Sequence, residues 1–355
     1  GLGSVLGYLA AGLVIGPFGL KLVTDSHAIL HIAEFGVVMF LFMIGLEMKP
    51  SHLWSLRKQI FGLGSLQVVI SALLMTLVSV QFGISWEVAF ICSSGFVLTS
   101  TAIVMQVLGE RKRLSTRPGQ KIVSILLFED LLIVPLLAIV TYLSPLKTES
   151  TISWWESAII ALVALAILVL IGRFILNPLF RILANSKARE VMTAAALFVV
   201  LGSALLMEEA GLSQAMGAFV AGVMLSESAF RHQLEADIEP FRGLLLGLFF
   251  LGVGMSLNLT VVAENWMLIG IGVFALMLTK GICIYLVARA AKSTHKTAME
   301  RALLMAQGGE FAFVLFAQAF NQKVIDETVK ANMTAIVVLS MVLTPIMLVL
   351  YEKFA

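Results

Sequence analysis

The stretch Leu126-Leu-Phe-Glu-Asp-Leu-Leu-Ile-Val-Pro135 places two adjacent carboxylates, Glu129 and Asp130, in a run that is otherwise apolar. This run extends from Ile122 to Leu143, which is long enough to cross a bilayer as a helix, and Asp130 falls near its middle. A lone charge at that depth costs at least about 2.5 kcal/mol, so an acidic residue there marks a candidate functional site. The alternatives that these residues leave open are a structural pair that a basic neighbour neutralises and a helix end that lies a few residues from where the pattern places it.

The composition of the chain is that of a polytopic membrane protein. Of the 355 residues, 59% are hydrophobic and only 13% are charged, and the mean hydropathy is +0.99. A soluble domain has about 25% charged residues. The two cysteines, Cys92 and Cys283, lie in apolar segments, so they indicate neither a disulfide framework nor a metal site. The partner we expect is the lipid bilayer and no nucleic acid, and the net charge of +2 says little about partners until it is sorted by side of the membrane.

Twelve apolar segments follow one another along the chain, and we expect each to be a transmembrane helix of an all-α protein. They cover approximately residues 2–16, 28–48, 59–81, 88–108, 122–143, 157–177, 191–208, 212–227, 241–257, 266–289, 300–320 and 331–351. Most of the 24 Lys and Arg residues fall in the connections that lie on one side of the membrane in this arrangement. The positive-inside rule makes this side cytoplasmic, and the C-terminus lies on it.

Two parts of the chain align with each other at a constant offset of 207 residues. Gly36–Met48 matches Gly243–Met255, and the same offset places Thr99–Thr101 over Ala306–Gly308. The offset shifts the segments by an odd number, so corresponding helices must cross the membrane in opposite directions. This pattern predicts an inverted-topology repeat, which is the architecture of many secondary transporters.

Two of the predicted helices contain residues that weaken a helix in its middle. Thr99, Ser100 and Thr101 have hydroxyls that compete for backbone hydrogen bonds. The stretch Gln307-Gly308-Gly309-Glu310 has two glycines, each of which weakens a helix by roughly 1 kcal/mol. Interrupted backbone is tolerated at that depth only where it is buried in protein or lines a wet cavity. We therefore expect two discontinuous helices at an ion site, with close helix packing as the alternative explanation of the glycine pair.

Three further charges fall within the predicted helices. Lys280 lies about ten residues from either end of its segment, and we expect it to be the counter-ion of Asp130 when no cation is bound. Glu310 and Glu34 are open between a structural ion pair and a role in conduction. A buried carboxylate such as Asp130 can hold either a proton or a small cation, so the pattern predicts a site at which the two compete.

Several motifs together resemble the monovalent cation:proton antiporters, specifically the Kef-type potassium/proton exchangers of bacteria. They are Gly1-Leu-Gly-Ser-Val-Leu-Gly-Tyr-Leu9, Gly45-Leu-Glu47, Ser100-Thr-Ala-Ile103, Leu127-Phe-Glu-Asp130, Gln307-Gly-Gly-Glu-Phe-Ala-Phe313 and the stretch from His232 to Phe250. The resemblance covers essentially the whole chain. It implies an antiporter that moves potassium out of the cell in exchange for protons, in a bacterial-type inner membrane and as a homodimer.

The resemblance also implies roles for particular residues. Asp130 would be the carboxylate that binds the cation and carries the proton, with Glu129 and Thr99–Thr101 beside it, and Lys280 would be its counter-ion. The breaks at Thr99–Thr101 and Gln307–Glu310 would belong to two crossed discontinuous helices of a sodium/proton-antiporter-like fold. No cofactor is expected in this chain, and potassium or sodium and protons would be the transported ions.

Two parts of the family's proteins are expected outside residues 1–355, which would form the cation/proton exchanger transmembrane domain. One is a first helix, the thirteenth of the family, and the other is a C-terminal nucleotide-binding regulatory domain. The residues 231–240 resemble a cytoplasmic loop that holds glutathione-gated Kef proteins closed through that domain. The residues of this loop to which the resemblance assigns a regulatory role are His232, Glu235, Asp237 and Glu239. Gln233 and Ala236 replace the usual Ala and Ser, which weakens the inference of glutathione gating.

Other functions remain to be separated from potassium/proton exchange. Glu129 stands where Kef proteins often have Gln, and a doubled acid accompanies sodium in several relatives, so a sodium/proton antiporter is the nearest alternative. A ligand-gated potassium channel-like protein and a membrane sensor without transport are the others. An enzyme is disfavoured, because Ser100 has no histidine in mid-membrane with which to form a nucleophilic pair.

Overall fold

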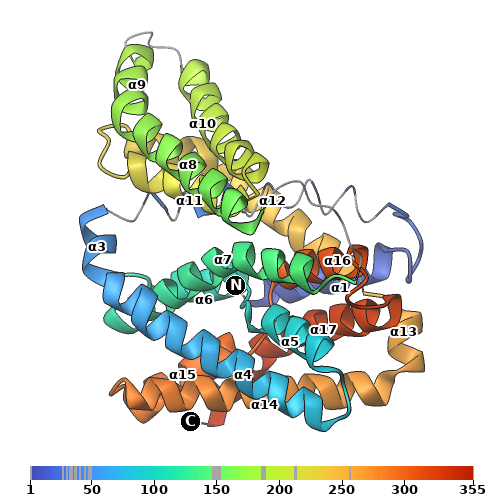
Figure 1. The fold of residues 1–355 in the computed structure, drawn as a ribbon. Helices are drawn as coiled ribbons and strands as arrows, with labels where there is room; N and C mark the ends of the chain where they lie inside the picture. Colours follow the sequence, from blue (N-terminus) through green and yellow to red (C-terminus); the bar gives the residue numbers. More distant parts are fainter. Residues whose placement is uncertain are drawn as a thin grey trace. The chain divides into compact units, whose positions relative to one another are not determined.

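The computed structural model describes residues 2–25, 28, 31, 35, 38, 39, 41–43, 45, 46, 50–145, 153–184, 189–211, 214–255 and 257–354 (Figure 1). Every regular element within these ranges is a helix, as the sequence predicts. The chain forms two compact units: unit 1 comprises residues 1–26, 57–148 and 253–355, and unit 2 comprises residues 27–56 and 149–252.

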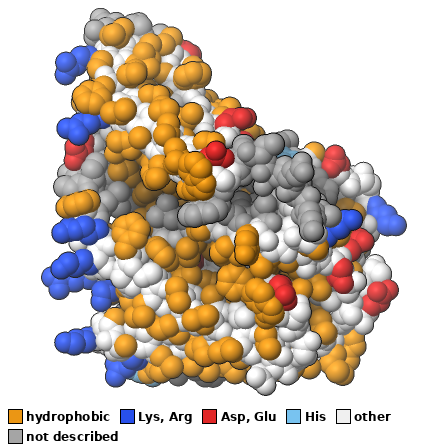
Figure 2. All heavy atoms as spheres, viewed as in Figure 1, with side chains coloured by type: hydrophobic (Ala, Val, Ile, Leu, Met, Phe, Trp, Pro, Cys, Tyr) orange, Lys and Arg blue, Asp and Glu red, His pale blue; other side chains and the backbone are white. Residues whose placement is uncertain are grey.

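Six helical stretches of the described chain are long and apolar enough to cross a membrane. They are Trp54–Gln81, Trp86–Glu110, Trp155–Leu183, Glu190–Glu209, Trp266–Ala290 and Glu327–Lys353. Side chains that are hydrophobic and exposed cover much of the visible surface (Figure 2). On α14, for example, Phe274 is 69% exposed and Leu278 is 49% exposed. Such flanks are expected of helices that face lipid instead of water.

Unit 1 contains most of the helices. They are α1 (Leu2–Ile15), the π-helical turn η1 (Gln59–Gly64), α4 (Ser65–Gln81), α5 (Trp86–Val97), α6 (Thr101–Glu110), α7 (Arg117–Leu143), α13 (Leu259–Glu264), α14 (Trp266–Ala290), α15 (His295–Met305), α16 (Glu310–Asn321) and α17 (Glu327–Phe354). Helix α14 packs against α4, α15 and α17, and α16 packs against α5, α7 and α17 (Figure 1). The short helix α3 (Pro50–Lys58) and the long helix α12 (Arg231–Met255) each have residues in both units.

Two helix breaks lie within unit 1, one at each position that the sequence predicts. Helix α5 ends at Val97, and Leu98 and Ser100 have extended ψ angles of 104° and 105° before α6 begins at Thr101. Helix α15 ends at Met305, and α16 begins at Glu310 after the extended Gly309. A Cβ on Gly309 would lie 2.5 Å from the backbone nitrogen of Ser100, so the two breaks are in backbone contact. The glycine pair therefore serves both a helix break and a close approach.

Unit 2 has its own hydrophobic core. Its helices are α8 (Trp154–Ile171), η2 (Gly172–Leu176), α9 (Asn177–Ala184), α10 (Arg189–Glu209) and α11 (Gln214–Leu225), together with most of α12. Phe42 and Phe180 are fully buried in this core. A Cβ on Gly45 would lie 2.3 Å from the carbonyl oxygen of Phe219, so only glycine permits the close approach of the backbone at position 45 to α11.

The predicted connection 231–240 is not a loop, and on this point the sequence-based boundary is wrong. These residues form the first ten residues of α12. Leu234 and Ile238 are spaced by four, so they share one helix face, and both are completely buried in the core of unit 2. Burial of this face stabilises a helix in a stretch that its acidic residues had marked as a loop. The predicted Glu34 lies outside the described residues.

Candidate functional site

Three carboxylates are buried together in unit 1. Glu129 and Asp130 lie on α7 and are 1% and 7% exposed, and Glu310, the first residue of α16, is 7% exposed. The charges of Glu310 and Glu129 both act on the carboxylate of Asp130. Because α16 packs against α7, Glu310 at the start of α16 adds a third acidic side chain to the adjacent residues Glu129 and Asp130.

A single buried lysine connects both helix breaks. Lys280, in the middle of α14, is 1% exposed. Its Nζ donates to the carbonyl oxygen of Phe96 at 3.1 Å, to Oγ1 of Thr99 at 3.0 Å and to the carbonyl oxygen of Gln307 at 2.6 Å. Phe96 and Gln307 lie at the C-terminal ends of α5 and α15, where unpaired carbonyls carry partial negative charge. The ammonium group thus stabilises two helix ends that the breaks would otherwise leave without partners.

Glu129 is linked to Lys280 through Thr99. Oε2 of Glu129 accepts a hydrogen bond from the backbone N–H of Thr99 at 2.8 Å, and Nζ of Lys280 donates to Oγ1 of the same residue, so the ammonium group lies near enough to act electrostatically on this carboxylate. The sequence assigned Lys280 to Asp130 instead. The role of Lys280 as counter-ion of Asp130 stays a prediction. The structure adds Glu129 as a partner of Lys280, whereas the sequence had placed Glu129 only beside the ion site.

The carboxylate of Asp130, a residue of α7, lies beside the N-terminal end of α6. Its Oδ1 accepts from Oγ1 of Thr101 at 3.3 Å. Ser100 is the N-cap residue of α6, and its Oγ accepts from the backbone N–H of Ile103 at 3.4 Å. An N-terminal helix end carries partial positive charge, which favours a negative group such as the Asp130 carboxylate. Of the three hydroxyl residues, Thr99 therefore contacts Lys280, Ser100 caps α6 and Thr101 contacts Asp130.

Several oxygens in this cluster have no hydrogen-bond partner among the described residues. They are Oε1 and Oε2 of Glu310, Oε1 of Glu129 and Oε1 of Gln307. Leaving a buried polar atom without a partner costs about 1–3 kcal/mol, and more if the atom is charged. Oxygen atoms of this kind suit the binding of a proton or of a hard monovalent cation.

The glycines beside Gln307 are held by the neighbouring helix α17. The backbone N–H of Gly308 donates to Oγ of Ser340 at 3.1 Å. A Cβ on Gly308 would lie 3.0 Å from the side chain of Val337 and 3.2 Å from that of Phe96. Sequence reasoning missed Ser340, because a single serine in a long apolar segment gives no sign of which backbone group it will meet.

The four residues of the predicted regulatory segment lie on α12 and within unit 2. Oε1 of Glu235 lies 3.4 Å from Nε of Arg231, and its Oε2 lies 3.3 Å from Nδ1 of His232. Asp237 is buried, with 6% exposure, whereas Glu239 is exposed. The structure therefore separates the four into a pairing group around Glu235, an inward-facing Asp237 and an outward-facing Glu239.

Comparison with known proteins gives one family. A family model described as "Sodium/hydrogen exchanger, transmembrane" matches residues 1–350. The chain is 54% identical over 355 residues to a glutathione-regulated potassium-efflux system protein of Haemophilus influenzae and 46% identical over 354 residues to the glutathione-regulated potassium-efflux system protein KefC of Escherichia coli K12. Both alignments cover 99% of this chain and 57% of the relative, so the chain spans little more than half the length of these proteins.

The fold resembles that of solved antiporter structures. The structure of the sodium proton antiporter MjNhaP1 from Methanocaldococcus jannaschii at pH 8 matches with a TM-score of 0.63 and 17% identity, over 96% of this chain and 89% of that one. An electron-microscopy structure of the same antiporter matches with a TM-score of 0.67 and 18% identity, over 96% and 87% of the two chains. At this level of identity the likeness concerns the fold alone.

Proposed function

Since the chain belongs to the sodium/hydrogen exchanger family, we propose that it is a secondary active antiporter that exchanges a monovalent cation for protons across a membrane. Potassium is the cation we infer, with potassium efflux coupled to proton entry, because the relatives at 54% and 46% identity are described as potassium-efflux system proteins. The protein acts as a transporter and not as an enzyme, and its ions are substrates instead of cofactors.

The observation that supports this function best is the excess of buried acid over buried base in one cluster. Glu129, Asp130 and Glu310 bury three carboxylates around one described ammonium group, that of Lys280. If every carboxylate were ionised, negative charge would remain uncompensated away from water, at a cost of several kcal/mol per ion. A bound proton or a dehydrated monovalent cation relieves that cost, and competition between the two for the same oxygens couples their movements.

Within the cluster, Asp130 is the carboxylate that takes the proton and the cation in turn. Thr101 contacts its Oδ1, and Thr99 and Ser100 add backbone and hydroxyl oxygens at the break beside it. Lys280 serves as the counter-ion, and its three hydrogen bonds keep the ends of α5 and α15 in place while the charge on the carboxylates changes. Gln307–Glu310 supply the facing oxygens from the second break.

The architecture we propose is an inverted-topology repeat with two crossed discontinuous helices, α5–α6 and α15–α16, within twelve transmembrane helices. Backbone contact between Gly309 and Thr99–Ser100 supports a crossing at the breaks. In folds of this kind the ion site lies near the bilayer midplane, where half-helix ends point at the ions. Residues 1–355 are the transmembrane exchanger domain in this proposal.

Sodium is the second candidate for the cation. Glu129 adds an acid next to Asp130, and a doubled acid accompanies sodium in several antiporters that the sequence resembles. A channel would use similar breaks but would need a continuous wet path. It would let potassium pass without moving protons in exchange.

Reconstitution into proteoliposomes tests the proposal directly. A pH gradient is imposed, and its dissipation on addition of potassium, sodium, rubidium or lithium is followed with a pH-sensitive dye. We expect potassium and rubidium to release the gradient and sodium and lithium to act weakly. A response to sodium alone would assign the second candidate. Potassium flux that leaves the proton gradient unchanged would indicate a channel and contradict exchange.

We propose that the protein lies in a bacterial inner membrane, with its C-terminus in the cytoplasm. We also propose that it forms a homodimer. A nucleotide-binding regulatory domain of the longer protein would dock on the start of α12. The relatives extend well beyond the length that this chain matches, which leaves room for such a domain. Glu235 is partly exposed and Glu239 is exposed there, so they suit a basic docking surface, whereas Asp237 is buried.

A further inference from the structure

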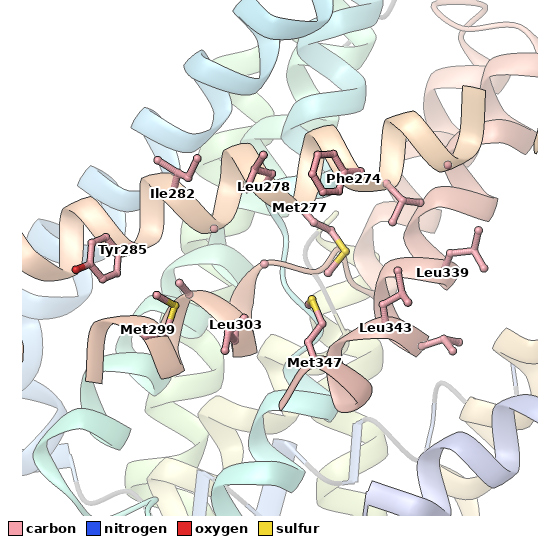
Figure 3. Close-up of a pocket in the computed structure, with 16 residues that line it drawn as sticks. Phe274, Met277, Leu278, Ile282, Tyr285, Met299, Leu303, Leu339, Leu343 and Met347 are labelled. Carbon is pink, nitrogen blue, oxygen red and sulfur yellow. The ribbon is translucent and has the colours of Figure 1, made fainter. Parts of the chain in front are cut away.

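A groove in unit 1 lies apart from the oxygens of the carboxylate cluster. It has a volume of about 610 Å³ and is formed by α14, α15 and α17 (Figure 3). The close-up shows Phe274, Leu278 and Ile282 of α14 along one side, with Leu303 of α15 and Leu343 of α17 opposite them. All the lining residues are apolar except for the hydroxyl of Tyr285. The volume lies in the range of about 300–1,000 Å³ that is typical of sites for small organic ligands.

The groove opens toward the surroundings of the helices. Phe274 is 69% exposed, Leu278 and Ile282 are each 49% exposed, and Leu343 is 38% exposed. Along α14 the lining extends from Gly270 to Tyr285, a length of roughly 22 Å at 1.5 Å per residue. One leaflet of a bilayer has a hydrocarbon thickness of roughly 15 Å. The groove is thus long enough for an extended acyl chain of a membrane lipid.

One end of the groove is basic. Tyr285 lies at this end, and its hydroxyl is hydrogen-bonded to Nδ1 of His295 at 2.8 Å. Arg289 follows Tyr285 by one turn of α14, and Lys292 and Lys296 lie in and just after the connection to α15, with all three side chains exposed. The N-terminal end of α15 adds partial positive charge at the same place.

Two acidic residues on helices that form the groove are paired with other bases. Glu300 of α15 pairs with Arg113, and Glu352 of α17 lies 2.6 Å from Arg111. The positive charge of Arg289, Lys292 and Lys296 is therefore available to an anion in the headgroup region. An apolar groove that ends at three basic side chains matches the shape and charge of a lipid with an anionic headgroup.

We propose that this groove binds an anionic phospholipid, with one acyl chain along α14 and the phosphate at Arg289, Lys292 and Lys296. The proposal depends on the chain lying in a bilayer and does not depend on which cation is exchanged. Ala306, which lines the groove, precedes Gln307, and Gly281 follows Lys280. The bound lipid therefore packs one residue away from the hydrogen bond between Lys280 and the carbonyl of Gln307.

Native mass spectrometry of the purified protein tests the headgroup part of this proposal. The probes are phosphatidylglycerol and phosphatidylcholine with identical acyl chains. We expect phosphatidylglycerol to bind more tightly, and the triple variant Arg289→Gln/Lys292→Gln/Lys296→Gln to lose this preference, by about fivefold for each basic residue removed. The control Lys58→Gln/Arg117→Gln removes exposed basic residues away from the groove and should keep the preference. Equal binding of both lipids by the native protein would overturn the proposal.

A second pair of variants tests the acyl-chain part. Leu278→Trp/Ile282→Trp fills the groove, and we expect it to bind at least one lipid fewer than the native protein with either headgroup. Leu268→Trp/Leu286→Trp places the same bulk on α14 at positions that are each 57% exposed and do not line the groove, and it should bind lipid as the native protein does. If filling the groove changes the oligomeric state and leaves the bound lipid unchanged, the groove holds a second copy of the chain and the lipid assignment is wrong.

Discussion

At the level of single side chains, Asp130 carries the first prediction. Asp130→Asn keeps the volume of the side chain but cannot bind a proton and a cation in turn, so we expect exchange in proteoliposomes to fall to the background of empty vesicles. Stability should be kept or raised, because the variant removes a charge from a buried position. The matched control is Asp326→Asn, an exposed residue whose Oδ1 accepts from the backbone N–H of Val329, a bond that Asn can also make. Native exchange by a folded Asp130→Asn protein would refute the mechanism.

The pair Lys280 and Glu129 carries the second prediction. Lys280→Met removes the cation that acts on the buried Glu129 carboxylate and the donor to the carbonyls of Phe96 and Gln307, so we expect it to lower stability by several kcal/mol. Glu129→Gln removes the charge and can still accept from the N–H of Thr99. In thermal unfolding in detergent, we expect the double variant to be more stable than Lys280→Met alone. A double variant whose destabilisation is the sum of the two single ones would indicate that the residues do not interact.

At the level of helices, the contact between the two breaks can be tested at Gly309. A Cβ there would meet Ser100 N at 2.5 Å and Thr99 C at 2.6 Å, which are backbone atoms and cannot rotate away. We expect Gly309→Ala to separate the breaks, to lower the unfolding temperature and to reduce exchange at least tenfold, equivalent to about 1.4 kcal/mol in the barrier. Gly202→Ala on α10, where a Cβ meets nothing within 4 Å, should be neutral or slightly stabilising. Equal behaviour of the two variants would contradict the backbone contact.

The start of α12 gives the second test at this level. Ile238 is fully buried in the core of unit 2, so Ile238→Ala should lower the free energy of unfolding by about 2–5 kcal/mol. Leu244→Ala on the same helix removes a side chain that is 66% exposed and should have a much smaller effect. Chemical unfolding in a mild detergent measures both. A small effect of Ile238→Ala would mean that residues 231–240 behave as the loop that the sequence predicts.

For the molecule as a whole, the proposed regulation predicts that a protein with the regulatory domain and residues 1–355 alone respond differently to the same substitutions. Glu235→Gln/Glu239→Gln removes accessible acid from the start of α12. In a protein that carries the regulatory domain, we expect basal exchange to rise, most at low ionic strength, where screening is weakest. The same double variant of residues 1–355 should exchange at the native rate. A rise of equal size in both proteins would show that the acids act within the membrane part and not through docking.

The sequence alone was sufficient for those features that depend on composition and local pattern. The apolar segments predicted an all-helical membrane protein, and Thr99–Thr101 and Gln307–Glu310 predicted the positions of the two breaks, because hydroxyls and paired glycines weaken a helix wherever they occur. The acids Glu129 and Asp130 were visible for the same reason, since charge is rare in an apolar run.

Only the tertiary structure decided which of these groups meet. It places Lys280 on the carbonyls of Phe96 and Gln307 and beside Glu129, although residues 96, 129, 280 and 307 are far apart in sequence. It also turns residues 231–240 into a helix, because Leu234 and Ile238 find a core that no local pattern reveals. Packing between distant helices selects one partner from several residues of similar chemistry, and that choice depends on how the whole chain folds.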